Sequence, residues 1–302
     1  MSPFAFPGAT ADREGASYVV VGAPLDVSTT FEPGARFGPR CVRHYAETFD
    51  DYDRRTDSHF TDIGVHEYGD LDAWDDAAAY LEFLDGELSD VVAEGAVPLL
   101  IGGEHTVSVA GVRATAPDVF VCLDAHLDLR SEYAGNEYSH ATTTRHALNI
   151  ADRTVIVGAR TGSAEEWERA SQEDVTVIPP ENVSDWDPGD DIAIDADGNG
   201  DDDGDSGDDT DVNGSTDTDG SVYLSVDIDA ADPAFAPGTG TKEPFGLAPR
   251  EMRDIVRRVA PYAVGFDIVE VNDRDDGQTA ALAGKLLREF IYTHAASRRQ
   301  EE

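Results

Sequence analysis

Seven short apolar runs constrain the fold of this chain more than any other feature of its sequence. They lie at residues 17–24, 97–103, 119–126, 154–160, 175–178, 221–229 and 263–271. Runs that are apolar at successive positions are typical of strands covered on both faces. Helical patterns separate them, most clearly at residues 73–94, 164–173, 249–260 and 279–298. Strands and helices in alternation predict the α/β fold class, with one parallel sheet covered by helices.

One segment, residues 185–220, interrupts this alternation with a run of Asp, Gly, Ser and Thr that contains no lysine or arginine. Such a composition buries too little apolar surface to offset the entropy of ordering the backbone. We therefore expect a solvated, disordered insertion in a single domain that spans residues 1–302. A calcium loop is the alternative, because residues 195–200 fit the pattern D-x-D-x-N-G, but its twelfth position is Ser206 instead of glutamate.

The charge balance of the chain is strongly acidic. There are 62 Asp and Glu residues and 22 Lys and Arg residues, which gives a formal net charge of −40. A dense carboxylate surface keeps a protein hydrated in concentrated salt, and the salt screens its self-repulsion, so this balance is typical of a halophile's cytosolic protein. An acidic calcium-binding surface protein and a nucleic-acid mimic are the alternatives. The sign of the charge disfavours binding to nucleic-acid phosphates.

The sequence predicts neither a membrane span nor a secretory signal. No apolar run approaches the roughly 18 residues that a membrane helix needs. The first residues, MSPFAFPGATADREG, lack a basic segment followed by an apolar one, so we expect a cytoplasmic protein. Two cysteines, Cys41 and Cys122, make no disulfide framework in a chain of this size. Cys122 lies in an apolar run, where we expect it to act as a small buried hydrophobe.

Three short motifs follow directly on apolar runs and carry acids and histidines: GGEHT at 102–106, DAHLD at 124–128 and SVDIDAADP at 225–233. The carboxyl ends of parallel strands meet at one edge of a sheet, where open α/β sheets bind their ligands. In an extended chain, side chains two residues apart point to the same side. The sequence therefore predicts six metal-ligating side chains that converge at this edge: His105, Asp124, His126, Asp128, Asp227 and Asp229.

This ligand set indicates two divalent ions. A single zinc ion takes three or four ligands that are usually richer in His or Cys, whereas six hard oxygen and nitrogen donors suit two ions that share bridging carboxylates, with manganese the expected metal. Four aspartates balance the charge of two such ions. A water molecule held between them is deprotonated near neutral pH and becomes a nucleophile. Polar capping of strand ends is the alternative for any one motif taken alone.

The three motifs GGEHT, DAHLD and SVDIDAADP, together with four further motifs, resemble those of the ureohydrolase family, which contains the arginases and the agmatinases. The further motifs are VGAPLDVSTTFEPGARFGP at 21–39, NEYSHATTTRHAL at 136–148, AFAPGTGT at 234–241 and GFDIVEVND at 265–273. The resemblance runs in order from about residue 17 to the C-terminus, apart from the acidic insertion. It implies a three-layer α/β/α fold around a central, mainly parallel eight-stranded sheet. It also implies a centre of two manganese ions and hydrolysis of a guanidino group to urea and an amine.

Carried over position by position, the resemblance divides the six ligands between two manganese ions. His105 and Asp128 complete one site, His126 and Asp229 complete the other, and Asp124 and Asp227 bridge the two ions.

The resemblance also implies two catalytic residues that contact the substrate, His140 and Glu270. His140 would pass a proton to the leaving amine, a role that suits an unperturbed pKa near 6.5. Glu270 would accept two parallel N–H bonds from the substrate guanidinium. The alternatives are a surface histidine for His140 and a strand-end charge in a surface ion pair for Glu270.

The expected substrate is agmatine, which would yield putrescine and urea. In arginases, an acid directly after a short strand motif holds the α-amino group of arginine. The corresponding stretch here, VGARTGS, has Thr161 and Gly162 at that place. With its acidic composition, the chain is most similar to an agmatinase from a halophilic archaeon. Lys242 and Phe245 stand where relatives usually have a Gly-Gly pair, which leaves the shape of the pocket open. An arginase, a guanidinobutyrase and an aminopropylagmatine ureohydrolase are therefore the alternatives.

Two other classes of protein fit parts of the sequence. An amide deacetylase of the same broad fold would use a single zinc ion, but the carboxylate pair Asp227 and Asp229 argues against it. A non-catalytic, acidic metal-binding protein would depend on residues 185–220. The family resemblance further implies a homo-oligomer, either a trimer or a hexamer.

Overall fold

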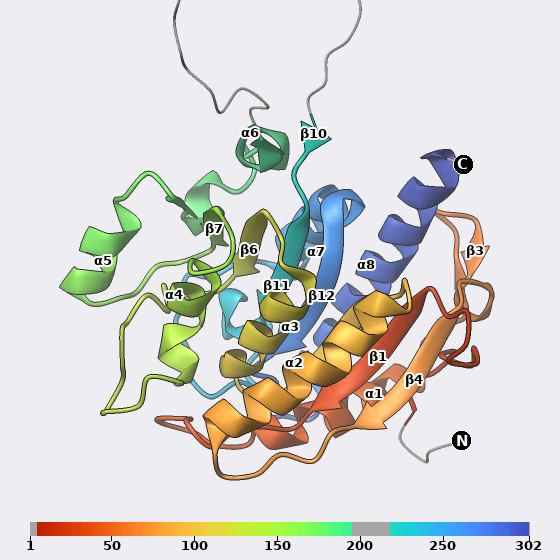
Figure 1. The fold of residues 1–302 in the computed structure, drawn as a ribbon, viewed down its shortest axis with the longest axis horizontal. Coiled ribbons are helices and arrows are strands. Elements are labelled where there is room, and N and C mark those ends of the chain that lie inside the picture. Colours follow the sequence, from red (N-terminus) through yellow and green to blue (C-terminus); the bar gives the residue numbers. More distant parts are fainter. Residues whose placement is uncertain (1–4, 195–217, 302) are drawn as a thin grey trace, which may run out of the picture.

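The computed structural model describes residues 5–194 and 218–301. One sheet of eight strands forms the centre of the molecule, and helices cover both of its faces (Figure 1). Every neighbouring pair of strands in this sheet is parallel. The predicted three-layer α/β/α class with its eight-stranded sheet is therefore confirmed.

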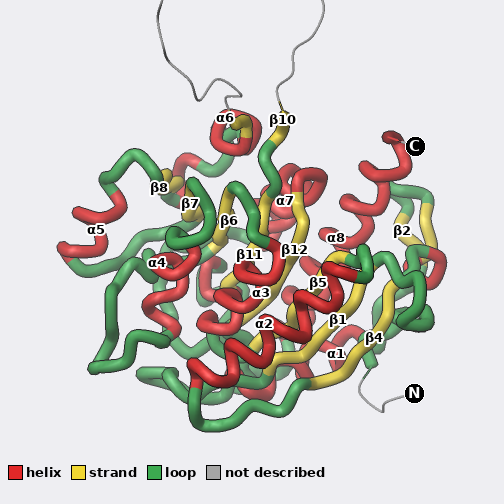
Figure 2. Tube along the Cα trace, in the orientation of Figure 1, coloured by secondary structure: helices red, strands yellow, loops and turns green. Residues whose placement is uncertain are grey.

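The order of the strands across the sheet differs from their order in the chain. The sequence across the sheet is β4 (Val65–Asp70), β1 (Tyr18–Ala23), β5 (Val97–Gly102), β12 (Ala263–Val269), β11 (Val222–Asp227), β6 (Val119–Leu123), β7 (Arg153–Val157) and β8 (Val175–Ile178). The four strands in the middle are buried along almost their whole length, as their apolar runs predict. Figure 2 shows these strands side by side between the helices.

Four helices cover one face of the sheet and three cover the other. The first group is α2 (Ala77–Ala93), α3 (Ser108–Thr115), α4 (Thr143–Ala147) and α5 (Ala164–Ala170); the second is α1 (Gly38–Ala46), α7 (Pro249–Val259) and α8 (Gln278–Glu301). Val19 and Val21 of β1 pack with α2, whereas Val20 between them packs in the cluster of α1 and α8. This alternation shows a strand that is buried on both faces. Among the described residues, no helix combines the length and the apolar character that crossing a lipid bilayer requires.

Seven of the eight strands in the central sheet correspond to the predicted apolar runs, and the eighth, β4, was not predicted. β4 is an edge strand with the sequence VHEYGD, in which only Val65 is buried, so it lacks the apolar run of a central strand. The four predicted helices correspond to α2, α5, α7 and α8. In α7 the apolar residues Met252, Ile255, Val256 and Val259 lie on one buried stripe, which is the spacing that predicts a helix. Helices α1, α3, α4 and α6, which have at most 9 residues each, were not predicted.

Short 3-10 helices connect several of these elements. They are η1 (Ala35–Phe37), η2 (Phe60–Asp62), η3 (His105–Val107), η4 (His140–Thr142), η5 (Pro180–Asn182), η6 (Ile228–Ala230) and η7 (Ala260–Tyr262). A small hairpin joins β2 (Tyr52–Asp53) to β3 (Ser58–His59). Of these connections, η3, η4 and η6 carry predicted site residues.

The beginning of the predicted acidic insertion is part of the folded domain. Residues 188–192 form α6 (Pro188–Ile192), and both Trp186 and Ile192 are buried in the core. The strand β9 (Ala193–Ile194) pairs with β10 (Thr218–Asp219). The prediction of a solvated segment is therefore wrong for residues 185–192, because it weighed the acids and overlooked these two apolar side chains. The calcium-loop residues 195–200 lie outside the described residues.

His294 on α8 is expected to make folding stability depend on pH. Its Nδ1 lies 2.7 Å from the Tyr18 hydroxyl, and burial lowers its pKa from 6.5 to about 4. Between these pH values the unfolded chain binds a proton that the folded chain does not, so lowering the pH costs about 3 kcal/mol of unfolding free energy through this group. We therefore compare the free energy of unfolding of the metal-free protein, measured with a chemical denaturant, with that of His294→Gln. Between about pH 7 and pH 4 we expect it to fall by about 3 kcal/mol more in the wild type. Equal pH dependence in the two proteins would contradict this assignment.

Candidate active site

The three predicted motifs meet at the carboxyl ends of neighbouring strands. GGEHT ends β5, DAHLD follows β6, and SVDIDAADP contains the end of β11. Because these strands are adjacent or separated only by β12, their ends lie at one edge of the sheet (Figure 1). Gly103 permits the close packing at the end of β5, since a Cβ atom there would lie 1.9 Å from the carbonyl oxygen of Leu25.

His105 is fully buried and faces three carboxylates with one ring nitrogen. Its Nδ1 lies 2.8 Å from Asp128 Oδ2, 3.1 Å from Asp124 Oδ2 and 3.6 Å from Asp227 Oδ2. Its Nε2 lies on the other side of the ring, 3.2 Å from the Ser225 hydroxyl. A proton on Nδ1 lets His105 donate to these carboxylates. If the ring instead kept its proton on Nε2, the Nδ1 lone pair would be free to bind a metal ion placed among them.

His126 forms a second group with two aspartates. Its Nδ1 lies 3.1 Å from Asp229 Oδ2 and 3.5 Å from Asp124 Oδ1. Asp124 thus faces His105 with one oxygen and His126 with the other. Asp227 lies near His105, and its Oδ1 accepts a hydrogen bond from the backbone N–H of Asp229 at 2.9 Å. The structure therefore brings all six predicted side chains together, with Asp124 between the two histidines.

Burial and mutual repulsion make several of these carboxylates costly to ionise. They raise the pKa of Asp128 to about 7 and that of Glu270 to about 8, and they raise the pKa of Asp227 well above its usual value. Burial acts on Asp124 in the same direction, but hydrogen bonds with His105 and His126 outweigh it and lower its pKa. The carboxylates in turn raise the pKa of His105 and His126, so these two imidazoles offset part of the negative charge. A divalent cation is the ordinary way to neutralise such a cluster in full.

The side chains converge for a different reason from the predicted one. β6 ends at Leu123, and Asp128 adopts a φ of 50°, so residues 124–128 are not an extended strand. Asp229 likewise lies in η6, after β11 has ended. The chain turns at each strand end and directs the acids inward, which a rule based on extended backbone does not describe.

Cys122 is a neighbour of the site that the motifs do not include. Its Sγ lies 3.6 Å from His105 Nε2 and 3.9 Å from Asp124 Oδ2, so His105, Cys122 and Asp124 are close enough to hold an ion, as are Asp124, His126 and Asp229. Burial raises the pKa of the Cys122 thiol to about 12, which keeps it neutral. The thiol contacts His105 through Nε2, whereas the carboxylates face Nδ1, and Asp124 is the carboxylate that it also contacts. These features fit the predicted packing role.

A comparison with known protein families decides to which group this site belongs. The sequence profile described as "Arginase family" matches residues 16–203 and 208–292. The chain belongs to the arginase family. The ureohydrolase resemblance drawn from the motifs is thereby confirmed, and the match continues on both sides of residues 204–207.

Several members of the arginase family resemble this chain along nearly its whole length. The crystal structure of agmatine ureohydrolase of Thermoplasma volcanium superposes with a TM-score of 0.86 at 32% identity and covers 100% of this chain and 98% of that one. The agmatinase of Pyrococcus horikoshii is 30% identical over 283 residues, which are 92% of each protein. The N(1)-aminopropylagmatine ureohydrolase of Thermococcus kodakarensis is 32% identical over 284 residues, which are 91% of this chain and 90% of that protein.

A cavity of about 300 Å³ opens beside the acidic group of this arginase-family chain. It is lined by His126 and Asp128 from the predicted ligands, by His140, and by Thr161 and Gly162 from the VGARTGS stretch. Lys242 and Phe245 do not line it. Lys242 instead forms an ion pair with Glu32 at 2.7 Å, and the Phe245 side chain is 87% exposed. The two departures from the family pattern thus lie outside the cavity wall.

His140 lines this cavity and is held by the loop that follows β1. Its Nε2 lies 3.0 Å from the Thr30 hydroxyl, and its backbone N–H donates to Ser28 Oγ at 2.9 Å. Glu104 in turn accepts hydrogen bonds from Ser28. Burial, helped by the nearby His126 and His105, lowers the pKa of His140 to about 4. The expected value near 6.5 is therefore too high, because the sequence does not show that the half-buried imidazole lies close to His126 and His105.

Glu270 lies at the end of β12 with an unusual backbone conformation. Its φ of 61° is in the left-handed region, which costs about 1 kcal/mol or more for a residue with a side chain. Its Oε1 accepts the backbone N–H of His105 at 2.8 Å, and its own N–H donates to the carbonyl of Gly103 at 2.8 Å. These bonds hold the buried carboxylate beside the β5 end, close to the predicted ligands.

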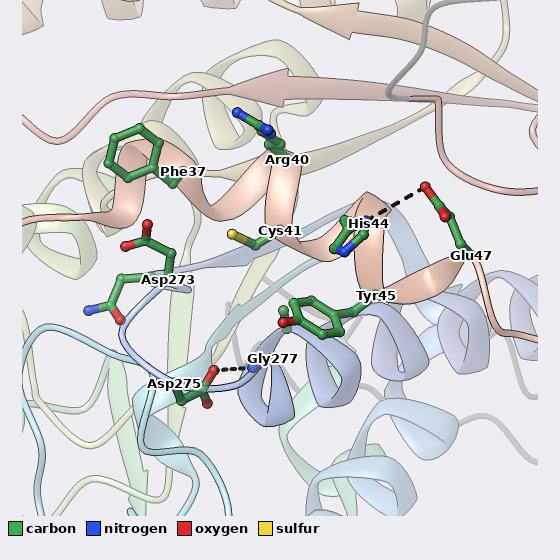
Figure 3. Close-up of a pocket in the computed structure, with 11 residues that line it drawn as sticks. Phe37, Arg40, Cys41, His44, Tyr45, Glu47, Asp273, Asp275 and Gly277 are labelled. Atoms are coloured by element: carbon green, nitrogen blue, oxygen red, sulfur yellow. Dashed lines mark hydrogen bonds and ion pairs between the residues drawn. The ribbon is translucent and has the colours of Figure 1, made fainter.

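A second cavity, of about 410 Å³, lies between α1 and the connection from β12 to α8. Figure 3 shows Arg40, Cys41 and Tyr45 on its α1 side, with Asp273 and Asp275 on the other. None of the eight predicted metal or catalytic residues lines it. Cys41 is therefore not part of the site at the strand ends.

Proposed function

We propose that this agmatinase-type ureohydrolase binds two manganese ions at the strand ends and hydrolyses a guanidino group to urea and an amine. The observation that carries the proposal is the position of Asp124, whose two carboxylate oxygens face His105 and His126 separately. A carboxylate placed between two histidines is suited to bridge two metal ions. Asp128 and Asp229 each stand next to one of these histidines.

The donor set fits manganese better than zinc. It offers carboxylate oxygens and imidazole nitrogens, which are hard or intermediate donors, and burial keeps the nearby Cys122 thiol neutral. His105 and Asp128 would hold one ion, His126 and Asp229 the other, and Asp124 and Asp227 both. When bound, two such ions supply Lewis acidity and a water molecule that is deprotonated near neutral pH.

His140 would act on the substrate from the cavity wall, and Glu270, which does not itself line the cavity, would act from the end of β12. Glu270 Oε1 is already engaged with the His105 N–H, so the remaining acceptor sites of its carboxylate are those that can receive guanidinium N–H groups. His140 is neutral at neutral pH because of its low pKa. It must therefore first accept a proton during the reaction at a ring nitrogen, and then return it to the leaving nitrogen.

Agmatine is the substrate that the sequence favours, since Thr161 and Gly162 stand where arginases carry an acid for the α-amino group. Glu166, which also lines the cavity, is paired with Arg130 at 3.1 Å. The names of the relatives include both agmatinase and N(1)-aminopropylagmatine ureohydrolase, so a longer amine is the second candidate. Assembly into trimers or hexamers and a cytoplasmic location stay predictions of the sequence and its family resemblance.

Urea release by the manganese-loaded protein tests this proposal. The assay compares agmatine, N(1)-aminopropylagmatine, 4-guanidinobutyrate and arginine in about molar salt, which screens the net charge of −40. We expect urea from agmatine at a rate at least about tenfold above that from arginine, because Thr161 and Gly162 offer no charged partner for the α-amino acid group of arginine, which agmatine lacks. A chelator-treated sample is the control. Urea from arginine alone would contradict the substrate assignment, and no urea from any compound would contradict the reaction.

A further inference from the structure

Arg160, which follows β7, binds backbone carbonyl groups from three separate segments around the site. One segment is the end of β7, the second is η6 with the residue after it, and the third is the loop before α7. The acceptors are the carbonyl oxygens of Gly158, Asp229, Ala230, Ala231, Glu243 and Pro244. The shortest of these bonds runs from Nη2 to Glu243 O at 2.6 Å, and the bond to Asp229 O measures 2.9 Å.

Only an arginine side chain can make this set of contacts. Its guanidinium presents five N–H donors in one plane, whereas a lysine ammonium places all its donors on a single atom. All the acceptors that bind Arg160 in the described part of the chain are carbonyl oxygens, so the side chain serves as a backbone clamp. Its positive charge also lies near Asp229 and Asp124, which attract it.

The 241–246 loop, before α7, packs closely against the Arg160 side chain. A Cβ atom at Gly246 would lie 2.5 Å from Arg160 Nη2 and 2.7 Å from the Ala230 carbonyl oxygen, so only glycine fits here. The Asp232 carboxylate accepts the backbone N–H groups of Phe245 at 2.7 Å and Gly246 at 3.2 Å. The loop before α7 is therefore fastened directly onto η6.

Asp229 and Thr241 connect the segments held by Arg160 to the predicted metal site. The Asp229 carboxylate lies 3.1 Å from His126 and accepts a hydrogen bond from the Thr241 hydroxyl at 3.1 Å. Thr241 belongs to the same loop and lines the cavity. We infer that Arg160 is a positioning residue: it fixes η6 so that the Asp229 carboxylate is directed at the metal, and it holds the 241–246 loop at the cavity. The inference rests on the metal site proposed above.

The test compares Arg160→Met with Arg258→Met in the full-length protein. Arg258 also donates to backbone carbonyls, those of Val183, Trp186 and Asp254, but none of them belongs to the clamped segments. Manganese affinity is measured by titration calorimetry, and the unfolding temperature is measured on metal-free samples. We expect Arg160→Met to weaken manganese binding by about tenfold or more. Arg258→Met should lower the unfolding temperature and leave the affinity unchanged.

Arg160→Lys separates the charge from the geometry. It keeps the cation but loses the planar set of donors, so we expect its manganese affinity to stay close to that of Arg160→Met. A wild-type manganese affinity in Arg160→Lys would show that the positive charge alone is sufficient, which would overturn the inference that Arg160 acts as a backbone clamp. Wild-type affinity in Arg160→Met would overturn it as well.

Gly246→Ala decides the question if Arg160→Met does not fold. The added methyl group displaces the loop from the guanidinium while Arg160 remains, so manganese binding should again weaken. Unchanged affinity in this variant would overturn the inference. A wild-type protein that binds no manganese would instead overturn the proposed metal site itself, so the two failures are distinguishable.

Discussion

Asp124→Asn is expected to reduce the rate of urea release by about 1000-fold, which corresponds to a loss of about 4 kcal/mol of transition-state stabilisation. Asp124 contacts both histidines, at 3.1 Å and 3.5 Å, and its carboxylate carries charge that two divalent ions require. Asparagine has the same shape but is neutral, and its nitrogen cannot bind a metal. We therefore also expect the manganese content to fall below that of the wild type, measured by atomic absorption after dialysis.

Asp118→Asn is the matched control for this variant. Asp118 precedes β6 at the end opposite Asp124, and its carboxylate accepts hydrogen bonds from the N–H and hydroxyl of Ser221. The substitution changes the same chemical group next to the same strand, so a loss of stability without a loss of metal is the expected outcome. If Asp124→Asn kept full manganese content and full activity, Asp124 would not bridge the two ions.

Glu270→Gln is expected to lower kcat/KM by about 100-fold, or about 3 kcal/mol, since it removes the charged partner of a buried guanidinium. The glutamine oxygen can still accept the His105 N–H that Glu270 Oε1 accepts at 2.8 Å, so the fold of the β5 end should persist. Steady-state kinetics together with metal analysis check this prediction. The manganese content should match that of the wild type.

Glu251→Gln provides a comparison at a glutamate with a similar structural role. Its carboxylate accepts the backbone N–H of Ala248 at 2.7 Å, but it lies at the start of α7 and is exposed. Kinetics like those of the wild type are expected. If Glu270→Gln also left kcat/KM unchanged, then Glu270 would not bind the guanidinium. If it lost manganese, its role would lie in holding His105.

The strand ends that carry the site could be predicted because their residue types and their position after apolar runs were both visible in the sequence. His105, Asp124 and Asp229 illustrate this, since each follows a strand that is buried on both faces. The local backbone could not be predicted in the same way. The left-handed φ of Asp128 and the η6 turn at Asp229 depend on contacts with neighbouring strands, which no pattern within a short motif records.

The properties that depend on burial or on distant partners were also hidden from the sequence. The low pKa of His140 results from its burial, to which no residue beside it in the chain points. Arg160 contacts Glu243, which is 83 positions away in the chain, through carbonyl groups that every residue possesses. Trp186 and Ile192 became core residues of a segment whose average composition is acidic, because two apolar side chains weigh little in that average.

The most direct test of the proposed metal centre is a crystal structure of the manganese-soaked protein with anomalous diffraction measured near the manganese absorption edge. We expect two anomalous peaks, one beside His105 and Asp128 and one beside His126 and Asp229, with the Asp124 carboxylate between them. A single peak, or peaks that contact none of these side chains in a protein that releases urea, would contradict the proposed metal centre.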